Sequence, residues 1–237
     1  MTLSEIPVAI LAGGRATRLG PLAADMPKAM IPVAGRPFVD HQLALLHRKG
    51  VRQVIFCVGH LGEQIQAHVG DGARYGLAVR YAYDGERLLG TGGAVRRALP
   101  LLGPLCYVIY GDAYLDIDYA AVLEYFLDRP EPALMTVFHN GKRWDTSNVL
   151  FRDGRIVRYD KRQPDPEMTY IDYGASLYRA AALERIPPNE PYDLGDLTHA
   201  LAQDQLLAGY EVTQRFYEVG SVAGIRDTEA YLRSRLP

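Results

Sequence analysis

The chain has 237 residues, of which 48% are hydrophobic and 23% charged, and its formal net charge is −2. This length allows one large α/β domain or two small ones and is enough to bury a substantial core. The charge balance offers no basic surplus, so we expect neither nucleic acid nor a membrane as a partner. The amino terminus has no basic segment before its short apolar stretch, which argues against a signal peptide or a membrane span, and we expect a cytoplasmic protein.

In the first half of the chain, apolar runs typical of buried strands alternate with segments of helical periodicity. The expected strands are residues 8–11, 51–59, 77–84, 105–112 and 132–139. The expected helices between them are residues 37–49, 63–69, 93–102 and 118–127. Strands separated by helices of this length form a mostly parallel sheet with helices on both faces.

The second half of the chain has a different pattern. Residues 148–161 form two alternating runs around Asp153-Gly154, which is a strong hairpin signal. Beyond it we expect strands at residues 170–178 and 211–220 and helices at residues 194–207 and 228–236. No linker interrupts the chain.

These patterns predict one domain over residues 1–237, an α/β fold of the Rossmann-like three-layer sandwich type with a mixed, mostly parallel central sheet. A nucleotide-binding core would occupy about residues 1–140, and a smaller substrate-binding part about residues 141–220. Cys57 and Cys106 both lie in apolar, strand-like runs, so buried free thiols are expected, with a disulfide as the alternative.

The most informative segment is residues 11–33, LAGGRATRLGPLAADMPKAMIPV, which follows the first expected strand. It contains two adjacent glycines, two arginines and a later lysine. Gly13 and Gly14 would let backbone amides face a ligand without an intervening Cβ, Arg18 offers a planar fork for phosphate oxygens, and Lys28 offers a point charge. The spacing matches neither the dinucleotide fingerprint nor the P-loop. A polyphosphate site is therefore favoured over a tight turn with solvated arginines.

The same segment resembles the signature of the sugar-1-phosphate nucleotidyltransferases, through LAGGRATRL at residues 11–19, Pro27-Lys28 and Pro32-Val33. The resemblance implies the nucleotide-diphospho-sugar transferase fold, and a reaction that joins a nucleoside monophosphate to a sugar 1-phosphate. A second glycine segment, LGTGGA, also matches the family. The residues implied to bind the nucleoside triphosphate are Leu11, Ala12, Gly13, Gly14, Arg15, Thr17, Gly90, Thr91 and Gly92.

Two carboxylates are implied as Mg²⁺ ligands by the resemblance. Asp112 follows the buried strand at residues 105–112, and the carboxyl ends of such strands are where α/β sheets bind ligands. The family usually has Asp-x-Gly near the end of the domain, where this chain has Glu218-Val219-Gly220. Glutamate still offers oxygens to a hard cation, although its longer side chain changes the metal geometry. Arg18, Lys28 and Asp112 are the implied catalytic residues, and Mg²⁺ is the implied cofactor.

The sugar 1-phosphate would be bound by residues of the second half. The resemblance assigns this role to Lys161, after the hairpin, and to Asp172 and Gly174, before the next strand. It also implies that the added β-helix domain of acetyltransferase-bearing relatives is missing here. A homodimer is compatible with this interpretation.

The reaction itself would need no general base, because the attacking phosphate oxygen is already an anion at neutral pH. Arg18, Lys28 and Lys161 would neutralise the two polyanions. The form of the LGTGGA segment is most similar to the mannose- and heptose-1-phosphate guanylyltransferases, so guanylyl transfer is the first expectation, and uridylyl or other nucleotidyl transfer is the alternative.

Two other classes of function remain open at this stage. A glycosyltransferase would use an Asp-x-Asp string to bind the metal of a nucleotide sugar, and Asp116-Ile117-Asp118 matches it, although helix capping is the simpler role. A catalytically silent nucleotide-binding relative is the other alternative, because Glu218 replaces the usual aspartate. Trp144 is expected to anchor a loop, with a place beside the sugar pocket as the alternative.

Overall fold

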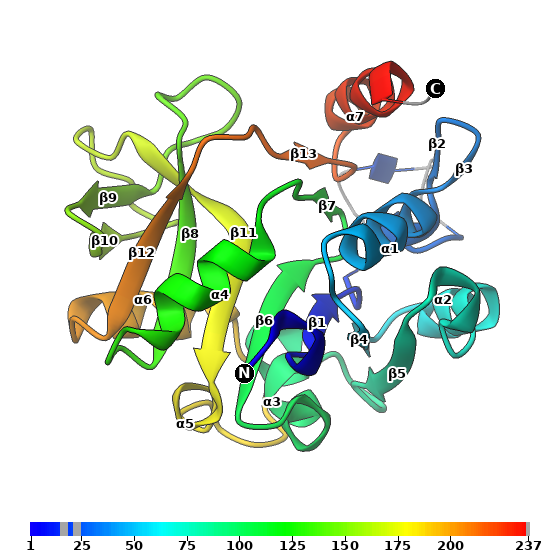
Figure 1. Ribbon diagram of the computed structural model, residues 1–237, viewed down its shortest axis with the longest axis horizontal. Coiled ribbons are helices and arrows are strands. Elements are labelled where there is room, and N and C mark those ends of the chain that lie inside the picture. Colours follow the sequence, from blue (N-terminus) through cyan, green and yellow to red (C-terminus); the bar gives the residue numbers. More distant parts are fainter. Residues whose placement is uncertain (15–18, 21–24, 236–237) are drawn as a thin grey trace.

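The computed structural model describes residues 1–14, 19–20 and 25–235. Its described part contains a nine-stranded mixed sheet (Figure 1). In order across the sheet, the strands are β5 (Ala78–Tyr83), β4 (Gln53–Val58), β1 (Val8–Leu11), β6 (Leu105–Tyr110), β11 (Tyr170–Arg179), β8 (Ala133–His139), β12 (Leu207–Val212), β10 (Arg155–Tyr159) and β9 (Val149–Arg152).

Strands β5, β4, β1 and β6 pair in parallel and form one half of the sheet. Strand β11 runs antiparallel to both of its neighbours, β6 and β8, while β12 is again parallel to β8. In the middle of the parallel half, Ile10 of β1 lies between Phe56 of β4 and Ile109 of β6. The expected mixed, mostly parallel sheet is confirmed.

Helices cover both faces of this sheet, as Figure 1 shows. One face is covered by α1 (Phe38–Arg48), α2 (Gly62–Val69) and α4 (Tyr119–Leu127). The other is covered by α3 (Gly90–Leu102), α5 (Ala180–Leu183) and α6 (Leu194–Gln203). Because side chains alternate along a strand, Val8 and Ile10 of β1 pack in the first layer and Ala9 in the second.

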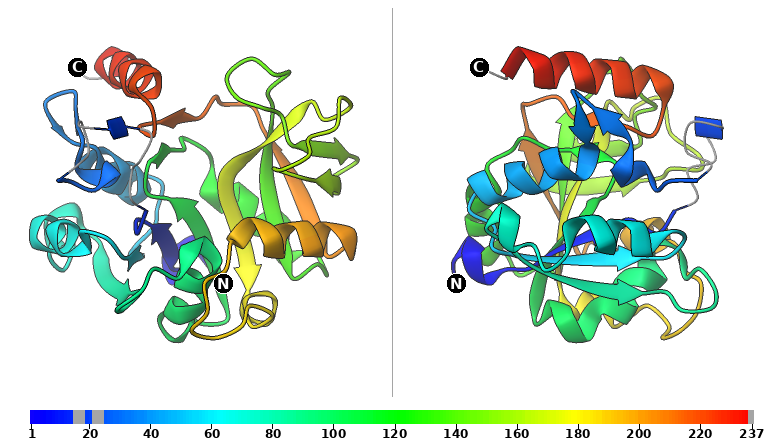
Figure 2. Two further views of the ribbon diagram at one scale, coloured as in Figure 1. Left: turned by 180° about the vertical axis from the view of Figure 1, so that it is seen from behind. Right: turned by 90° about the vertical axis from the view of Figure 1, so that its right-hand side faces the viewer.

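The last helix, α7 (Val222–Arg235), packs outside these two layers, against β13 (Tyr217–Glu218) and β2 (Pro32–Val33). Figure 2 shows it from two further sides. Strand β13 pairs with β7 (Ala113–Tyr114), and β2 pairs with β3 (Arg36–Pro37). These short pairings bring the carboxyl-terminal part of the chain to the end of β6.

The predicted hairpin forms at Asp153-Gly154, where both residues have positive φ angles of 49° and 75°. This is the conformation that a two-residue hairpin turn requires, and asparagine, aspartate and glycine tolerate it best. Cys57 and Cys106 are buried free thiols, as expected. None of the helices in the described part of the chain has the length and apolarity needed to span a bilayer.

Three elements near the carboxyl terminus differ from the sequence interpretation. The last helix, expected over residues 228–236, begins at Val222 and ends at Arg235. The helix expected over residues 194–207 ends at Gln203, because Gln205 adopts a left-handed conformation with φ of 58°. Leu207 then begins β12, so the strand expected over 211–220 starts earlier and stops at Val212. The errors at residues 194–207 and 211–220 have one cause: Leu207 is buried in the sheet, where it pairs with Ala133 of β8.

Candidate active site

A cavity of about 930 Å³ opens at the carboxyl ends of β1, β4 and β6. Residues from both halves of the chain line it, and most of the predicted site residues are among them. These are Leu11, Ala12, Gly13, Gly14, Lys28, Gly90, Thr91, Asp112, Lys161, Asp172, Gly174 and Glu218. Arg15, Thr17 and Arg18 lie outside the described residues. Gly92 does not line the cavity, and its amide donates a hydrogen bond of 2.8 Å to the Tyr192 carbonyl.

The floor of the cavity is formed by closely packed backbone after β1. A Cβ on Gly13 would lie 3.0 Å from the Gly59 nitrogen, and a Cβ on Gly111 would lie 2.8 Å from the Leu11 carbonyl oxygen. The Ala12 amide donates to the Cys57 carbonyl at 2.9 Å, which ties this loop to the end of β4. Glycine is therefore required at these positions because the chain segments approach too closely for a side chain.

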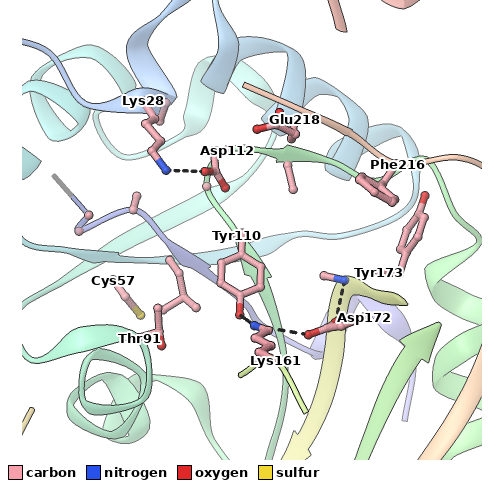
Figure 3. Close-up of a pocket in the computed structure, with 18 of the residues that line it drawn as sticks. Lys28, Cys57, Thr91, Tyr110, Asp112, Lys161, Asp172, Tyr173, Phe216 and Glu218 are labelled. Carbon is pink, nitrogen blue, oxygen red and sulfur yellow. Dashed lines mark hydrogen bonds and ion pairs between the residues drawn. The ribbon is translucent and has the colours of Figure 1, made fainter. Parts of the chain in front are cut away.

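Lys28 and Asp112 face each other across one side of the cavity (Figure 3). Lys28 Nζ lies 2.8 Å from Asp112 Oδ2, and the two side chains are 20% and 23% exposed. Lys28 begins a short 3₁₀ helix (Lys28–Met30), while Asp112 lies in the turn between β6 and β7. The two residues are 84 positions apart in sequence and come together only in the folded chain.

The second predicted carboxylate, Glu218, reaches the same place through the pairing of β13 with β7. Glu218 pairs with Ala113, and the Val219 amide donates to the Asp112 carbonyl at 2.9 Å. A Cβ on Gly220 would lie 2.6 Å from Glu218 Oε2 and 3.2 Å from Asp112 Oδ2. The two carboxylates thus converge on the space that a Gly220 side chain would fill.

Glu218 is also bonded to the segment that leads into α7. The Gly220 amide donates to Oε2, and the Ser221 hydroxyl donates to Oε1 at 2.7 Å. A negative charge just before a helix is stabilised by the exposed amide groups of the first turn. The hydrogen bonds of Glu218 therefore connect the segment before α7 to the two carboxylates, Asp112 and Glu218.

Lys161 and Asp172 occupy another part of the cavity, with Tyr110 beside them (Figure 3). Lys161 Nζ lies 3.8 Å from Asp172 Oδ2 and 3.4 Å from the Tyr110 hydroxyl oxygen. Burial alone would lower the pKa of Lys161, but the neighbouring Tyr110 and Asp172 outweigh it and raise that pKa. The lysine is therefore a cation at neutral pH.

Gly174 and Asn148 hold Asp172 in position. The Gly174 amide donates to Asp172 Oδ1 at 3.0 Å, and the Asp172 amide donates to Asn148 Oδ1 at 3.0 Å. Gly174 has φ of +97°, and the β11–β8 register shifts between Asp172 and Ser176. Such a bulge turns a side chain out of the regular alternation, as is common beside active sites.

Comparison with known proteins identifies the family. A family model described as nucleotidyl transferase matches residues 8–160, which is more than half of the chain. The chain belongs to this family.

A uridylyltransferase for UTP and glucose 1-phosphate from Synechocystis sp. is 28% identical over 233 residues, which cover 90% of this chain and 60% of the relative. A mannose-1-phosphate guanylyltransferase from Mycobacterium tuberculosis is 29% identical over 202 residues, which cover 79% of this chain and 52% of the relative.

The chain thus spans between half and two thirds of the length of these curated relatives. Among solved structures, HddC from Yersinia pseudotuberculosis complexed with GMP-PN has a TM-score of 0.78 and 22% sequence identity. The match covers 96% of this chain and 99% of that chain. At this identity the likeness establishes the shared fold, in agreement with the predicted three-layer α/β architecture.

In this member of the nucleotidyl transferase family, the Asp-x-Asp string is not part of the cavity. Asp118 caps α4 by accepting a hydrogen bond of 3.0 Å from the Ala121 amide, and Asp116 forms an ion pair of 2.6 Å with Lys49. Neither aspartate is among the residues that line the cavity. The structural roles of both residues remove the main argument for a glycosyltransferase.

Sequence reasoning missed further residues in and around the site. Gln42 of α1 is 1% exposed and donates hydrogen bonds of 2.9 and 2.8 Å to the carbonyls of Tyr110 and Ala113, on either side of Asp112. Its signal was a polar residue within the apolar stripe of a helix. Asp84 and Asn148 were missed as well, and unlike Gln42 they line the cavity itself. The signal for Asp84 was the one used for Asp112, a carboxylate directly after a parallel strand.

Trp144 lines the cavity and is also fixed within its loop. Its amide donates to Asn140 Oδ1 at 3.3 Å, and the guanidinium groups of Arg143 and Arg215 lie 4.7 and 4.8 Å from the centre of its ring. The expected role as a loop anchor is confirmed, and a place of Trp144 beside the sugar pocket stays a prediction.

Proposed function

We propose that this protein transfers a nucleoside monophosphate from a nucleoside triphosphate to a sugar 1-phosphate, giving a nucleotide sugar and pyrophosphate. The first candidate is guanylyl transfer to a mannose- or heptose-type 1-phosphate. Uridylyl or another nucleotidyl transfer to a different sugar 1-phosphate is the alternative. The two relatives described above act on different nucleotides, so family membership alone supports the reaction class and leaves the base open.

The observation that carries this proposal is the presence of two lysine–carboxylate pairs, Lys28–Asp112 and Lys161–Asp172, in one cavity. A reaction between two polyanions requires cations at two points, because two unit charges of like sign at 4 Å repel by about 4 kcal/mol at an effective dielectric constant of 20. In this proposal Lys28 neutralises the triphosphate, together with Arg18, and Lys161 neutralises the sugar phosphate.

Asp112 and Glu218 are the proposed Mg²⁺ ligands, and their arrangement fits that ion. Their oxygens are hard donors and converge beside Gly220. The part of the chain that the structure describes contains no group of three or more side chains suited to hold a metal. This also fits, because Mg²⁺ is usually held by one or two carboxylates together with substrate phosphates. When bound, Mg²⁺ would supply positive charge at the reacting phosphate.

The side chains of the protein would then act by positioning the two substrates and by stabilising charge in the transition state. The sugar phosphate oxygen attacks the α-phosphorus, and the bond to the β-phosphate bridging oxygen breaks, so that pyrophosphate leaves with its charge held by Lys28. No side chain has to remove a proton from the nucleophile. Asp172 and Gly174 would orient the sugar. The backbone of the glycine loop after β1 would lie along the bound triphosphate.

The proposal is tested by measuring pyrophosphate release with Mg²⁺, each common nucleoside triphosphate and a panel of sugar 1-phosphates. Pyrophosphate release that requires both the nucleoside triphosphate and the sugar 1-phosphate supports the proposal. Selective nucleotide binding by calorimetry without pyrophosphate release for any sugar phosphate would instead support a catalytically silent relative. Transfer of sugar from a nucleotide sugar to an acceptor, without pyrophosphate release, would support a glycosyltransferase.

A further inference from the structure

Arg215 is a partly buried cation beside the cavity, and the proposed reaction gives it no role. It lies in the segment that leads from β12 into β13, and its side chain is 29% exposed. Phe216 and Glu218 of this segment line the cavity, whereas Arg215 and Tyr217 do not. This division follows the alternation of side chains that is typical of an extended chain. Arg215 and Tyr217 therefore support the cavity wall from behind.

Three contacts hold the guanidinium group of Arg215. Its central carbon lies 4.8 Å from the centre of the Trp144 ring and 4.9 Å from the centre of the Tyr217 ring. Its Nη2 atom lies 2.5 Å from Asp227 Oδ2, in α7. A guanidinium can combine these contacts because its flat faces stack on rings while its N–H groups donate in its own plane. Arg215 thus connects Trp144 to α7.

The α7 end of this connection is firmly anchored. The Tyr217 ring is stacked on Tyr231 of α7, with ring centres 4.0 Å apart. The Tyr231 hydroxyl donates a hydrogen bond of 3.2 Å to Asp116 Oδ2, and Asp116 forms its ion pair with Lys49 directly after α1. Helix α7 therefore offers Arg215 a fixed support.

The Trp144 end has fewer ties to the rest of the molecule. Trp144 is 41% exposed and belongs to the loop between β8 and β9. Its ring contacts Phe138 of β8, with ring centres 5.6 Å apart, and the guanidinium of Arg143. Arg143 belongs to the same loop, so it cannot fix that loop to another element. The contact with Arg215 is what joins the Trp144 ring to the carboxyl-terminal helix.

The hydrogen bonding of Arg215 indicates that this contact determines position more than it adds stability. Its Nε atom is buried and has no hydrogen-bond partner among the described residues. A buried donor without a partner disfavours the folded state. An apolar side chain packed between Trp144 and Tyr217 would avoid this penalty, but it could not be held in one direction by Asp227.

The aromatic contacts of Trp144 show which end of the cavity it borders. The Phe138 ring that it touches also lies 6.3 Å from the Phe216 ring and 6.4 Å from the Tyr173 ring. In Figure 3, Tyr173 and Phe216 lie on the same side of Tyr110 as Asp172. Given the proposed function, on which this inference rests, Asp172 marks the end of the cavity that holds the sugar.

We propose that Arg215 is a positioning residue, which holds Trp144 against α7 as a wall of the sugar end of the cavity. Aromatic side chains commonly line ligand pockets, and a wall in a fixed position orders the ligand that packs against it. Arg215 touches neither Lys28 nor Asp112 in the described contacts. Its effect should therefore fall on the sugar 1-phosphate and spare the nucleotide.

The informative variant is Arg215→Lys, which keeps the positive charge but loses the flat surface that stacks on the two rings. It should raise the KM for the sugar 1-phosphate about fivefold or more, because both cation–π contacts are weakened. The KM for the nucleoside triphosphate and kcat should change much less. Glu218 is held independently, by the pairing with Ala113 and by the Ser221 hydroxyl, so the proposed metal site should persist.

Arg233→Lys is the matched control. Arg233 is also an arginine paired with an acid of α7, at 2.7 Å from Glu229 Oε1, but it contacts no residue of the cavity wall. Asp227→Asn is a second test variant. It leaves the arginine in place and weakens its ion pair, so it should change the same KM in the same direction by a smaller factor. Thermal unfolding establishes that each variant is folded.

The first experiment compares steady-state pyrophosphate release by the wild type and these variants with Mg²⁺, varying one substrate at a time. Binding without turnover is measured by calorimetric titration with sugar 1-phosphates, mannose 1-phosphate and glucose 1-phosphate among them. Mg²⁺ and the α,β-methylene analogues of GTP and UTP, which cannot release pyrophosphate, are present in these titrations.

Tryptophan fluorescence tests the position of the wall directly. Trp144 is the single tryptophan of the chain, so its emission reports on this one site. Acrylamide should quench Trp144 more strongly in Arg215→Lys than in the wild type or Arg233→Lys. A purely structural role of Arg215 would instead lower the melting temperature and affect both substrates alike.

The inference is overturned if folded Arg215→Lys and Asp227→Asn keep the wild-type affinity for sugar 1-phosphates, or if their nucleotide affinity falls equally. Turnover by the wild type together with that result leaves the proposed function standing. Sugar 1-phosphate binding that weakens in Arg215→Lys, without pyrophosphate release by the wild type, supports the inference and refutes the proposed function. A wild type that binds no sugar 1-phosphate overturns both.

Discussion

The Nζ atom of Lys28 lies 2.8 Å from Oδ2 of Asp112, so the cation that follows the glycine loop is paired with the carboxylate that follows β6. Two groups for which we propose different ligands, phosphate for Lys28 and Mg²⁺ for Asp112, therefore neutralise each other. In this arrangement a bound triphosphate would compete with Asp112 for Lys28, and its Mg²⁺ would compete with Lys28 for Asp112. The first two predictions separate these roles.

Asp112→Asn should reduce kcat by about a hundredfold or more while changing nucleotide affinity much less. The physical reason is that charge at the α-phosphate increases in the transition state, where a carboxylate-bound metal acts most strongly. The measurement is kcat from pyrophosphate release and the dissociation constant from calorimetry. A near-normal kcat would show that Asp112 is not a metal ligand.

Lys28→Ala should raise the KM for the nucleoside triphosphate by about tenfold or more, because a charge-assisted contact to phosphate is lost. Lys49→Ala is the matched control. Lys49 also forms a short ion pair with an aspartate, Asp116, but it does not line the cavity. Steady-state kinetics at saturating sugar phosphate give the comparison, and an equal effect of both substitutions on KM would argue against phosphate binding by Lys28.

Gly220→Ala should lower kcat by about tenfold or more with only a small change in the melting temperature. The new Cβ would lie 2.6 Å from Glu218 Oε2 and 3.2 Å from Asp112 Oδ2, so these carboxylates would have to move. Side-chain ends can move at little energetic cost to the fold, but displacement of reacting groups by about 1 Å can reduce the rate strongly. Wild-type kcat in Gly220→Ala would contradict the proposed use of both carboxylates.

Gln42→Leu should lower the free energy of unfolding by about 1–3 kcal/mol, because it leaves the partly buried Tyr110 and Ala113 carbonyls without the Gln42 donor. The turn that carries Asp112 should also become less well fixed, so kcat should fall more than the nucleotide affinity. Urea denaturation and steady-state kinetics measure the two effects. A loss of stability with unchanged kcat would assign Gln42 a purely structural role.

Asp84→Asn should make the folded protein more stable at neutral pH. Burial raises the folded-state pKa of Asp84 above its ordinary value of 3.8, so the folded state binds this proton more tightly than the unfolded state does. The wild type therefore loses stability as pH rises from the unfolded pKa through the folded pKa, and the asparagine variant does not lose this contribution. The stability advantage of the variant should shrink as the pH falls toward 3.8.

Urea denaturation of both proteins across this pH range provides the measurement. A variant that is less stable than the wild type at neutral pH would mean that the ionised Asp84 stabilises the fold.

Much of the fold could be predicted from the sequence because its signals are local. The apolar runs at Val8–Leu11 and Leu105–Tyr110 predicted buried strands, and Asp153-Gly154 predicted a hairpin. Asp112 could be placed at the edge of the sheet because it closely follows one of these strands, while its role and that of Lys28 stay predictions. Arg18 belongs to this predicted site, and it stays a prediction because it lies outside the described residues.

Other features could not be predicted, because they depend on contacts between distant segments. The sequence interpretation placed Leu207 in a helix, whereas its burial beside β8 makes it part of β12. Nothing near Gln42 in the sequence indicates that its amide would donate to the carbonyls on either side of Asp112, which lies 70 residues further along the chain. The role of Asp116 likewise followed only from its partner, Lys49, whereas helix capping by Asp118 was already an alternative in the sequence interpretation.

The sequence by itself determined the order of strands and helices and the family signature around Gly13 and Lys28, because both depend on the spacing of neighbouring residues. Only the tertiary structure decided that Glu218 meets Asp112, because the pairing of β13 with β7 joins segments more than 100 residues apart. It also decided that Asp84 is buried in the cavity, since burial depends on what packs around the end of β5.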